Sequence, residues 1–137
     1  MLEVEEAGPE FSVILAVHDP ECSRLLAILF DGFGYRILEC RDAETLEQRL
    51  RDAGDIHAAV IDLSLPKVED ICHRIREHAS VPILALCPGD PAEAAPMGEK
   101  LRCDALEPLR AEPERWLVAL RRLIIRDEPE RDAPVSR

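Results

Sequence analysis

Five short, mostly apolar runs recur along the chain, and more polar segments that can form helices separate them. An apolar run bounded by turn residues is typical of a buried strand. The runs predict strands over Ser12–Val17, Tyr35–Cys40, His57–Asp62, Val81–Cys87 and Ala105–Leu106, the last of them weak. Strands that alternate with helices predict an α/β fold, a doubly wound, five-stranded parallel sheet with helices on both faces.

The first helix begins with clear signals. Asp19-Pro20 predicts an N-cap followed by proline at the first helical position. The periodicity predicts a core-facing stripe made of Cys22, Leu25, Leu26, Leu29 and Phe33. Later helices are expected over Ala43–Asp52, Asp70–His78 and Glu112–Arg126.

The stretch after the fourth strand is rich in proline. Pro88, Pro91 and Pro96 each lack an N–H and restrict the residue before them. We therefore expect the helix in this region to be short, displaced or disordered.

The two ends of the chain are highly charged. The acidic segment 1–10 and the charged segment 127–137 are predicted to be disordered tails around a single domain, 11–126.

The composition limits the partners and the kinds of site that the chain is expected to have. The net charge of -11 argues against nucleic acid or an anionic membrane as a partner. The five cysteines are odd in number and contain no Cys-x-x-Cys pair, which argues against a disulfide framework or a zinc site. The sequence shows no signal peptide and no apolar stretch of membrane-spanning length, so a cytoplasmic protein is expected.

Two carboxylates mark the candidate chemistry. Asp62 ends the third predicted strand, and His18-Asp19 follows the first. The carboxyl ends of parallel strands gather at one edge of a sheet, where ligands bind, so Asp19 and Asp62 are expected to meet. Two carboxylates at this edge could hold a Mg²⁺ ion, and one of them could accept a phosphoryl group.

From Phe11 to Arg126 the chain resembles a response-regulator receiver domain. The resemblance is carried by His18-Asp19 with Arg24 five positions later, by Gly34-Tyr35, by Asp62 with Pro66, and by Val81-Pro82. It implies a flavodoxin-like sheet in the order 2-1-3-4-5, with Asp62 as the phosphoacceptor and Asp19 and Asp62 as Mg²⁺ ligands. It also implies a phosphoryl pocket made of His18, Leu63, Ser64, Cys87, Pro88 and Glu107.

The chain departs from the receiver pattern at several of these positions. Cys87 stands where the family carries Thr or Ser, and Pro88 has no N–H to offer a phosphoryl group. Glu107-Pro108 replaces Lys-Pro, and no aromatic residue lies between Tyr35 and Trp116 to serve as a switch. The amides of Leu63 and Ser64 are the phosphoryl partners expected to remain free. We therefore predict weak Mg²⁺ binding and weak or absent switching.

Each candidate residue also has a purely structural interpretation. Asp19 could be only a helix cap, Asp62 a carboxylate bonded by its own turn, and Cys87 a packed small residue rather than a redox sensor. His18 could be a solvent-facing replacement for an acid, or a phosphohistidine or metal ligand.

Two functions compete at this stage. One is a phosphorelay receiver with Asp62 as the phosphoacceptor, and the other is a pseudo-receiver that binds proteins without phosphate. An enzyme is not expected, because the chain has no glycine-rich phosphate loop and no nucleophile–base pair. The expected partner is a histidine kinase or another signalling protein, with a homodimer possible. Trp116 and the last helix are the predicted interaction surface.

Overall fold

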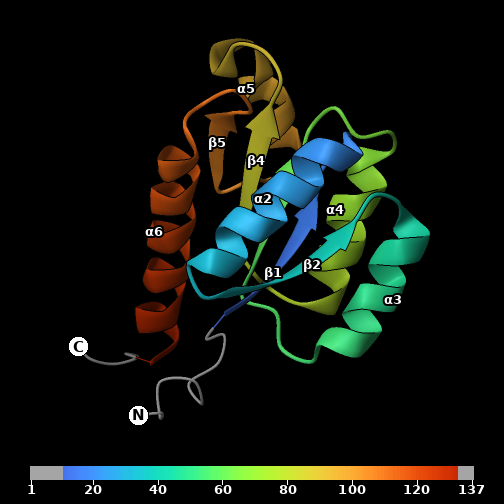
Figure 1. Ribbon diagram of the computed structural model, residues 1–137, viewed down its shortest axis with the longest axis vertical. Coiled ribbons are helices and arrows are strands. Elements are labelled where there is room, and N and C mark those ends of the chain that lie inside the picture. The colour runs from blue at the N-terminus through green and yellow to red at the C-terminus, as the bar shows by residue number, and fades with distance from the viewer. Residues whose placement is uncertain (1–10, 133–137) are drawn as a thin grey trace.

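The computed structural model describes residues 11–132 and contains one five-stranded parallel sheet in the order β2-β1-β3-β4-β5, as predicted (Figure 1). The central strands are buried almost throughout, which is why their sequences are continuously apolar. The strands are β1 (Phe11–Ala16), β2 (Tyr35–Cys40), β3 (Ala58–Asp62), β4 (Ile83–Cys87) and β5 (Ala105–Pro108).

Helices cover both faces of this sheet and divide the core into two clusters. The helices are α2 (Pro20–Gly32), α3 (Ala43–Ala53), α4 (Val68–His78), α5 (Pro91–Lys100) and α6 (Pro113–Asp132). On one face, Phe30 of α2 and Trp116 and Leu120 of α6 pack against β1, β3 and β4. On the other face, Leu46 of α3 and Ile71 of α4 pack on the alternate side chains of the same strands.

Helix α2 is rotated relative to the prediction. Its buried residues are Ser23, Leu26, Ala27 and Phe30, whereas Leu25 and Phe33 are 67% and 63% exposed. The predicted core stripe is therefore wrong at Leu25 and Phe33. Ser23 can be buried because its hydroxyl donates to Glu39 Oε1 over 2.9 Å, and a satisfied hydroxyl has little cost in a core.

The expectation of a short, displaced or disordered helix after β4 is also wrong. Helix α5 has 10 residues, against 11 in each of α3 and α4. Pro91 occupies the first turn, where a missing N–H has no consequence, and Asp90 caps the helix by accepting from the Ala92 N–H. Pro96 lies inside the helix and removes one hydrogen bond without ending it.

The last helix is longer than expected. Helix α6 continues to Asp132, into the segment that the sequence assigned to the C-terminal tail. The predicted tail 1–10 and residues 133–137 of the predicted tail 127–137 lie outside the described residues. Among the residues that the structure describes, no helix combines the length and apolar character needed to cross a membrane.

Candidate functional site

Asp62 ends β3 at the carboxyl edge of the sheet, and its carboxylate is hydrogen-bonded on both oxygens. Oδ1 accepts from the Ser64 N–H at 2.9 Å and from the Ser64 hydroxyl at 2.7 Å, and Oδ2 accepts from the His18 N–H at 3.0 Å. A carboxylate has about four acceptor positions, so these donors use most of them. Asp62 is also only 1% exposed. This carboxylate acts as the acceptor that joins the β1–α2 turn to the β3–α4 turn.

Asp19 lies at the neighbouring strand end and caps α2. Its Oδ2 accepts from the Cys22 N–H at 3.3 Å, as the N-cap prediction requires. Burial raises the pKa of the Cys22 thiol, and the negative charges of Asp19 and Asp62 raise it further. The side chain of His18 is exposed, and only its backbone N–H reaches Asp62.

The oxygen ligands at this edge do not fit a Mg²⁺ ion well. Mg²⁺ requires near-octahedral oxygen coordination, and most acceptor positions of Asp62 are already occupied by protein donors. His18 stands where the resemblance implies a further acid. Among residues 11–132, no group of three or more His, Cys, Asp or Glu side chains is arranged to hold a metal.

The β4–β5 half of the edge carries no side chain that could donate strongly to a phosphoryl group. Cys87 ends β4, is 1% exposed, and directs its thiol toward the carbonyl oxygens of Gly89 at 3.5 Å and Glu107 at 3.7 Å. Burial raises the pKa of this thiol, and the charges of Asp90 and Glu107 also raise it. Cys87 is thus packed as a small, protonated residue. The next residue, Pro88, has no N–H to donate.

Glu107, which the resemblance matches to the family's lysine, lies in β5 beside β4. In the β4–β5 register, Glu107 lies opposite Leu86 and Pro108 lies opposite Cys87. Its Oε1 accepts from Arg115 Nε at 2.7 Å. Arg115, near the start of α6, therefore offsets the carboxylate charge. The sequence reasoning missed this residue, although its position eight residues after Glu107 places it across the turn before α6.

The prediction of two free amides after Asp62 is wrong. The Leu63 N–H donates to the Leu86 carbonyl at 2.9 Å, which extends the β3–β4 pairing by one residue. The Ser64 N–H is bonded to Asp62 itself. Neither amide is available to a phosphoryl group in this conformation.

Trp116 is buried, so the predicted interaction surface is wrong at this residue, whereas the last helix, which the prediction also named, exposes Val118 and Ile125 at 50% and 47%. The indole is 5% exposed and belongs to the α2–α6 core cluster. Its Nε1–H donates to the Pro108 carbonyl at 2.8 Å, which satisfies the one polar atom of the ring. The apolar residues that are exposed instead include Leu25, Ile28 and Phe33.

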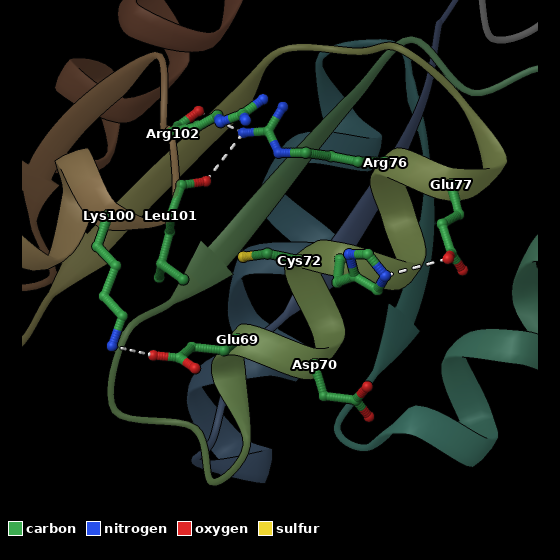
Figure 2. A pocket seen from close by; sticks show the side chains of 9 residues that line it. Glu69, Asp70, Cys72, Arg76, Glu77, Lys100, Leu101 and Arg102 are labelled. Carbon is green, nitrogen blue, oxygen red and sulfur yellow. Dashed lines mark hydrogen bonds and ion pairs between the residues drawn. The ribbon is translucent and has the colours of Figure 1, made fainter.

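Two of the clefts in the structure contain clusters of charged side chains, and Asp62 lines neither of them. Figure 2 shows the first, a cleft of about 760 Å³ between α4 and the end of α5. Its charges are largely paired within the cleft: Lys100 with Glu69 at 2.6 Å, and His73 with Glu77 at 3.0 Å. Arg76 donates to the carbonyls of Leu101 and Arg102. The second cleft, of about 610 Å³, lies beside His18 and Pro66.

No family model and no curated protein matches the sequence. Solved structures match well in shape. The N-terminal domain of a response regulator/sensory box/GGDEF protein from Carboxydothermus hydrogenoformans has a TM-score of 0.73 at 13% identity, covering 87% of this chain and 98% of that one. The Vibrio cholerae chemotaxis protein CheY4 has a TM-score of 0.71 at 17% identity, covering 82% and 98%.

A third neighbour is the receiver domain of HemR from Leptospira biflexa, with a TM-score of 0.70 at 21% identity. The match covers 84% of this chain and 94% of that one. Neighbours at these identities establish the fold alone. The chain has the flavodoxin-like fold of response-regulator receiver domains.

Proposed function

We propose that this chain is a receiver-fold signalling module that acts by binding a partner protein and does not use aspartyl phosphate as its switch. The observation that carries the proposal is the state of Asp62, which is 1% exposed and accepts three hydrogen bonds from His18 and Ser64. A phosphoacceptor must present a free oxygen to the incoming phosphorus. To free an oxygen here, Asp62 would have to break its hydrogen bonds to donors on two turns.

The surroundings of Asp62 support the same conclusion. Phosphorylation of an aspartate replaces the single negative charge of its carboxylate with about two charges on a phosphoryl group, whose three acceptor oxygens need donors. The hydroxyl, the amide and the lysine expected from the resemblance are replaced by Cys87, Pro88 and Glu107. A phosphoryl group at this site would therefore be poorly stabilised. Weak binding of Mg²⁺ would not supply the missing donors.

Helix α2 supplies a surface for the proposed partner. Leu25 and Ile28 are 67% and 62% exposed, and Phe33 follows the helix at 63%. Large apolar side chains gathered on one exposed helix are typical of protein-binding surfaces. A histidine kinase or another signalling protein is the expected class of partner. Ile28→Glu should weaken its binding, whereas Arg51→Glu, an exposed change on α3, should not.

The direct test is phosphorylation in vitro. The protein is incubated with acetyl phosphate and Mg²⁺, and its intact mass is followed over time, with Asp62→Asn as the matched control. We expect little or no phosphoryl adduct, and few amide shifts in ¹H–¹⁵N spectra when beryllofluoride is added. Fast, stoichiometric addition to the natural chain that is absent from Asp62→Asn would contradict the proposal.

A phosphorelay receiver is the second candidate, and one observation favours it. Asp62 accepts from the His18 N–H at 3.0 Å, and Asp19 is the next residue in the chain, so both acids belong to the same edge of the sheet. A partner that reorients Ser64 could free one oxygen of Asp62. Phosphotransfer that requires the partner histidine kinase and fails with acetyl phosphate would favour this candidate.

A further inference from the structure

The second cleft, of about 610 Å³, lies over the carboxyl ends of β1 and β2. Three segments form it: the β1–α2 turn with the start of α2, the β2–α3 turn with the first turns of α3, and Pro66 from the β3–α4 loop. In open α/β sheets, ligands bind at the carboxyl edge of the strands. The cleft thus has the position of a ligand site, and Asp62 is not among its lining residues.

Three arginines line this cleft: Arg24 from α2, Arg41 from the β2–α3 turn and Arg49 from α3. They come from three separate elements, so the fold gathers them from positions far apart in the sequence. This is unexpected in a chain whose net charge is -11. A local cluster of guanidinium groups can still attract an anion, because the charges of distant carboxylates are screened over about 8 Å at physiological salt.

The cleft also contains two carboxylates, and both are engaged by the protein. Glu39 Oε1 accepts from the Ser23 hydroxyl at 2.9 Å. Asp42 Oδ1 accepts from the N–H and the hydroxyl of Thr45, each at 2.8 Å, in a capping box at the start of α3. These bonds direct Asp42 and Glu39 toward protein donors.

The arginines, in contrast, have donors to spare. Arg49 uses only its Nε, which donates to the Glu39 carbonyl at 2.9 Å. Among the side chains that the structure describes, which are those of residues 11–125, none forms a hydrogen bond or ion pair with the guanidinium group of Arg24 or Arg41. Two cations of the larger cleft in Figure 2 differ, since Lys100 is paired with Glu69 and Arg76 donates to backbone carbonyls.

We propose that this cleft binds a small phosphate-bearing molecule through Arg24, Arg41 and Arg49. A guanidinium group matches two phosphate oxygens at once, and a phosphate monoester carries nearly two negative charges. The N-termini of α2 and α3 are already capped by Asp19 and Asp42, so the guanidinium groups would hold the anion. A bound ligand would affect Asp62 through His18, because His18 lines the cleft and donates its N–H to Asp62.

The proposal does not depend on whether Asp62 is phosphorylated, because the ligand is held without a covalent bond. The test is an NMR titration with three probes at constant ionic strength: inorganic phosphate, AMP and adenosine. The variants are Arg24→Gln with Arg41→Gln, and Arg51→Gln as a matched control on α3 outside the cleft. Both target side chains are exposed, so the fold should persist, and amide dispersion checks this.

We expect saturable shifts with AMP at residues 18–24 and 41–49, and none of them with adenosine. Each lost guanidinium contact should weaken binding about tenfold, while Arg51→Gln should bind as the natural chain does. Inorganic phosphate binding as tightly as AMP would identify the phosphate ion as the ligand, and tighter AMP binding would identify a phosphate ester. Unchanged affinity in the double variant, or equal shifts with adenosine, would overturn the proposal.

Discussion

The two halves of the sheet's carboxyl edge have diverged in opposite ways. At the β1–β3 half, Asp19 and Asp62 remain, and Asp62 is hydrogen-bonded to donors on both neighbouring turns. At the β4–β5 half, Cys87 is packed and Glu107 is paired with Arg115. Both halves keep the strand register of the fold. The comparison teaches that backbone pairing and apolar burial maintain this fold although several residues at its carboxyl edge differ from those that the resemblance implies.

The largest expected effect is a loss of stability when Asp62, in the β1–β3 half of the edge, is replaced. Asp62→Ala leaves the His18 and Ser64 N–H groups without their acceptor, and we expect the free energy of unfolding to fall by about 2–3 kcal/mol. Urea unfolding measures the change. Asp19→Ala, which removes only a helix cap, is the control and should cost about 1 kcal/mol. A rise in stability for Asp62→Ala would mean that repulsion between the two acids outweighs these bonds.

The second prediction concerns a triple variant in the β4–β5 half of the edge. Cys87→Thr, Pro88→Ala and Glu107→Lys together restore a hydroxyl, an amide and a cation near Asp62. Such donors stabilise a transferring phosphoryl group, and we expect acetyl phosphate to react at least about tenfold faster than with the natural chain. Intact-mass kinetics measure the rate, and the same triple variant with Asp62→Asn is the control. No gain in rate would locate the block in the bonds around Asp62 itself.

A smaller effect concerns the Glu107–Arg115 pair. Its side chains are 19% and 62% exposed, so solvent screens it. We expect Glu107→Gln to lower the free energy of unfolding by about 0.5 kcal/mol and Arg115→Gln to do the same. The double variant should lose little more than either single variant, which a double-mutant cycle tests. Fully additive losses would show that the two side chains do not interact in solution.

The smallest expected effect tests how close Asp19 lies to Cys22. The pKa of the thiol is raised first by burial and then by Asp19 and Asp62. Asp19→Asn removes a negative charge, so the thiol pKa should fall and the thiolate fraction at pH 8 should rise. We expect alkylation of Cys22 by iodoacetamide to be about twofold faster, measured by peptide mass spectrometry. Cys87, which is 1% exposed, serves as the unreactive internal reference.

The sequence alone determined the number, type and order of the elements. The runs ending at Val17, Asp62 and Cys87 are apolar enough to be read directly as buried strands, and the Asp19-Pro20 pair marks the start of α2. It also located the weak points of the pocket at Cys87 and Pro88, because a missing hydroxyl and a missing N–H are properties of the residue itself.

Only the tertiary structure decided which face of each helix is buried and which donors are already used. Helix α2 carries two overlapping apolar stripes, and the burial of Ser23 through Glu39 selected the one that exposes Leu25. The Leu63 amide is bonded to Leu86, and Arg115 pairs with Glu107. These choices depend on contacts between segments distant in sequence, and local periodicity carries no information about such partners.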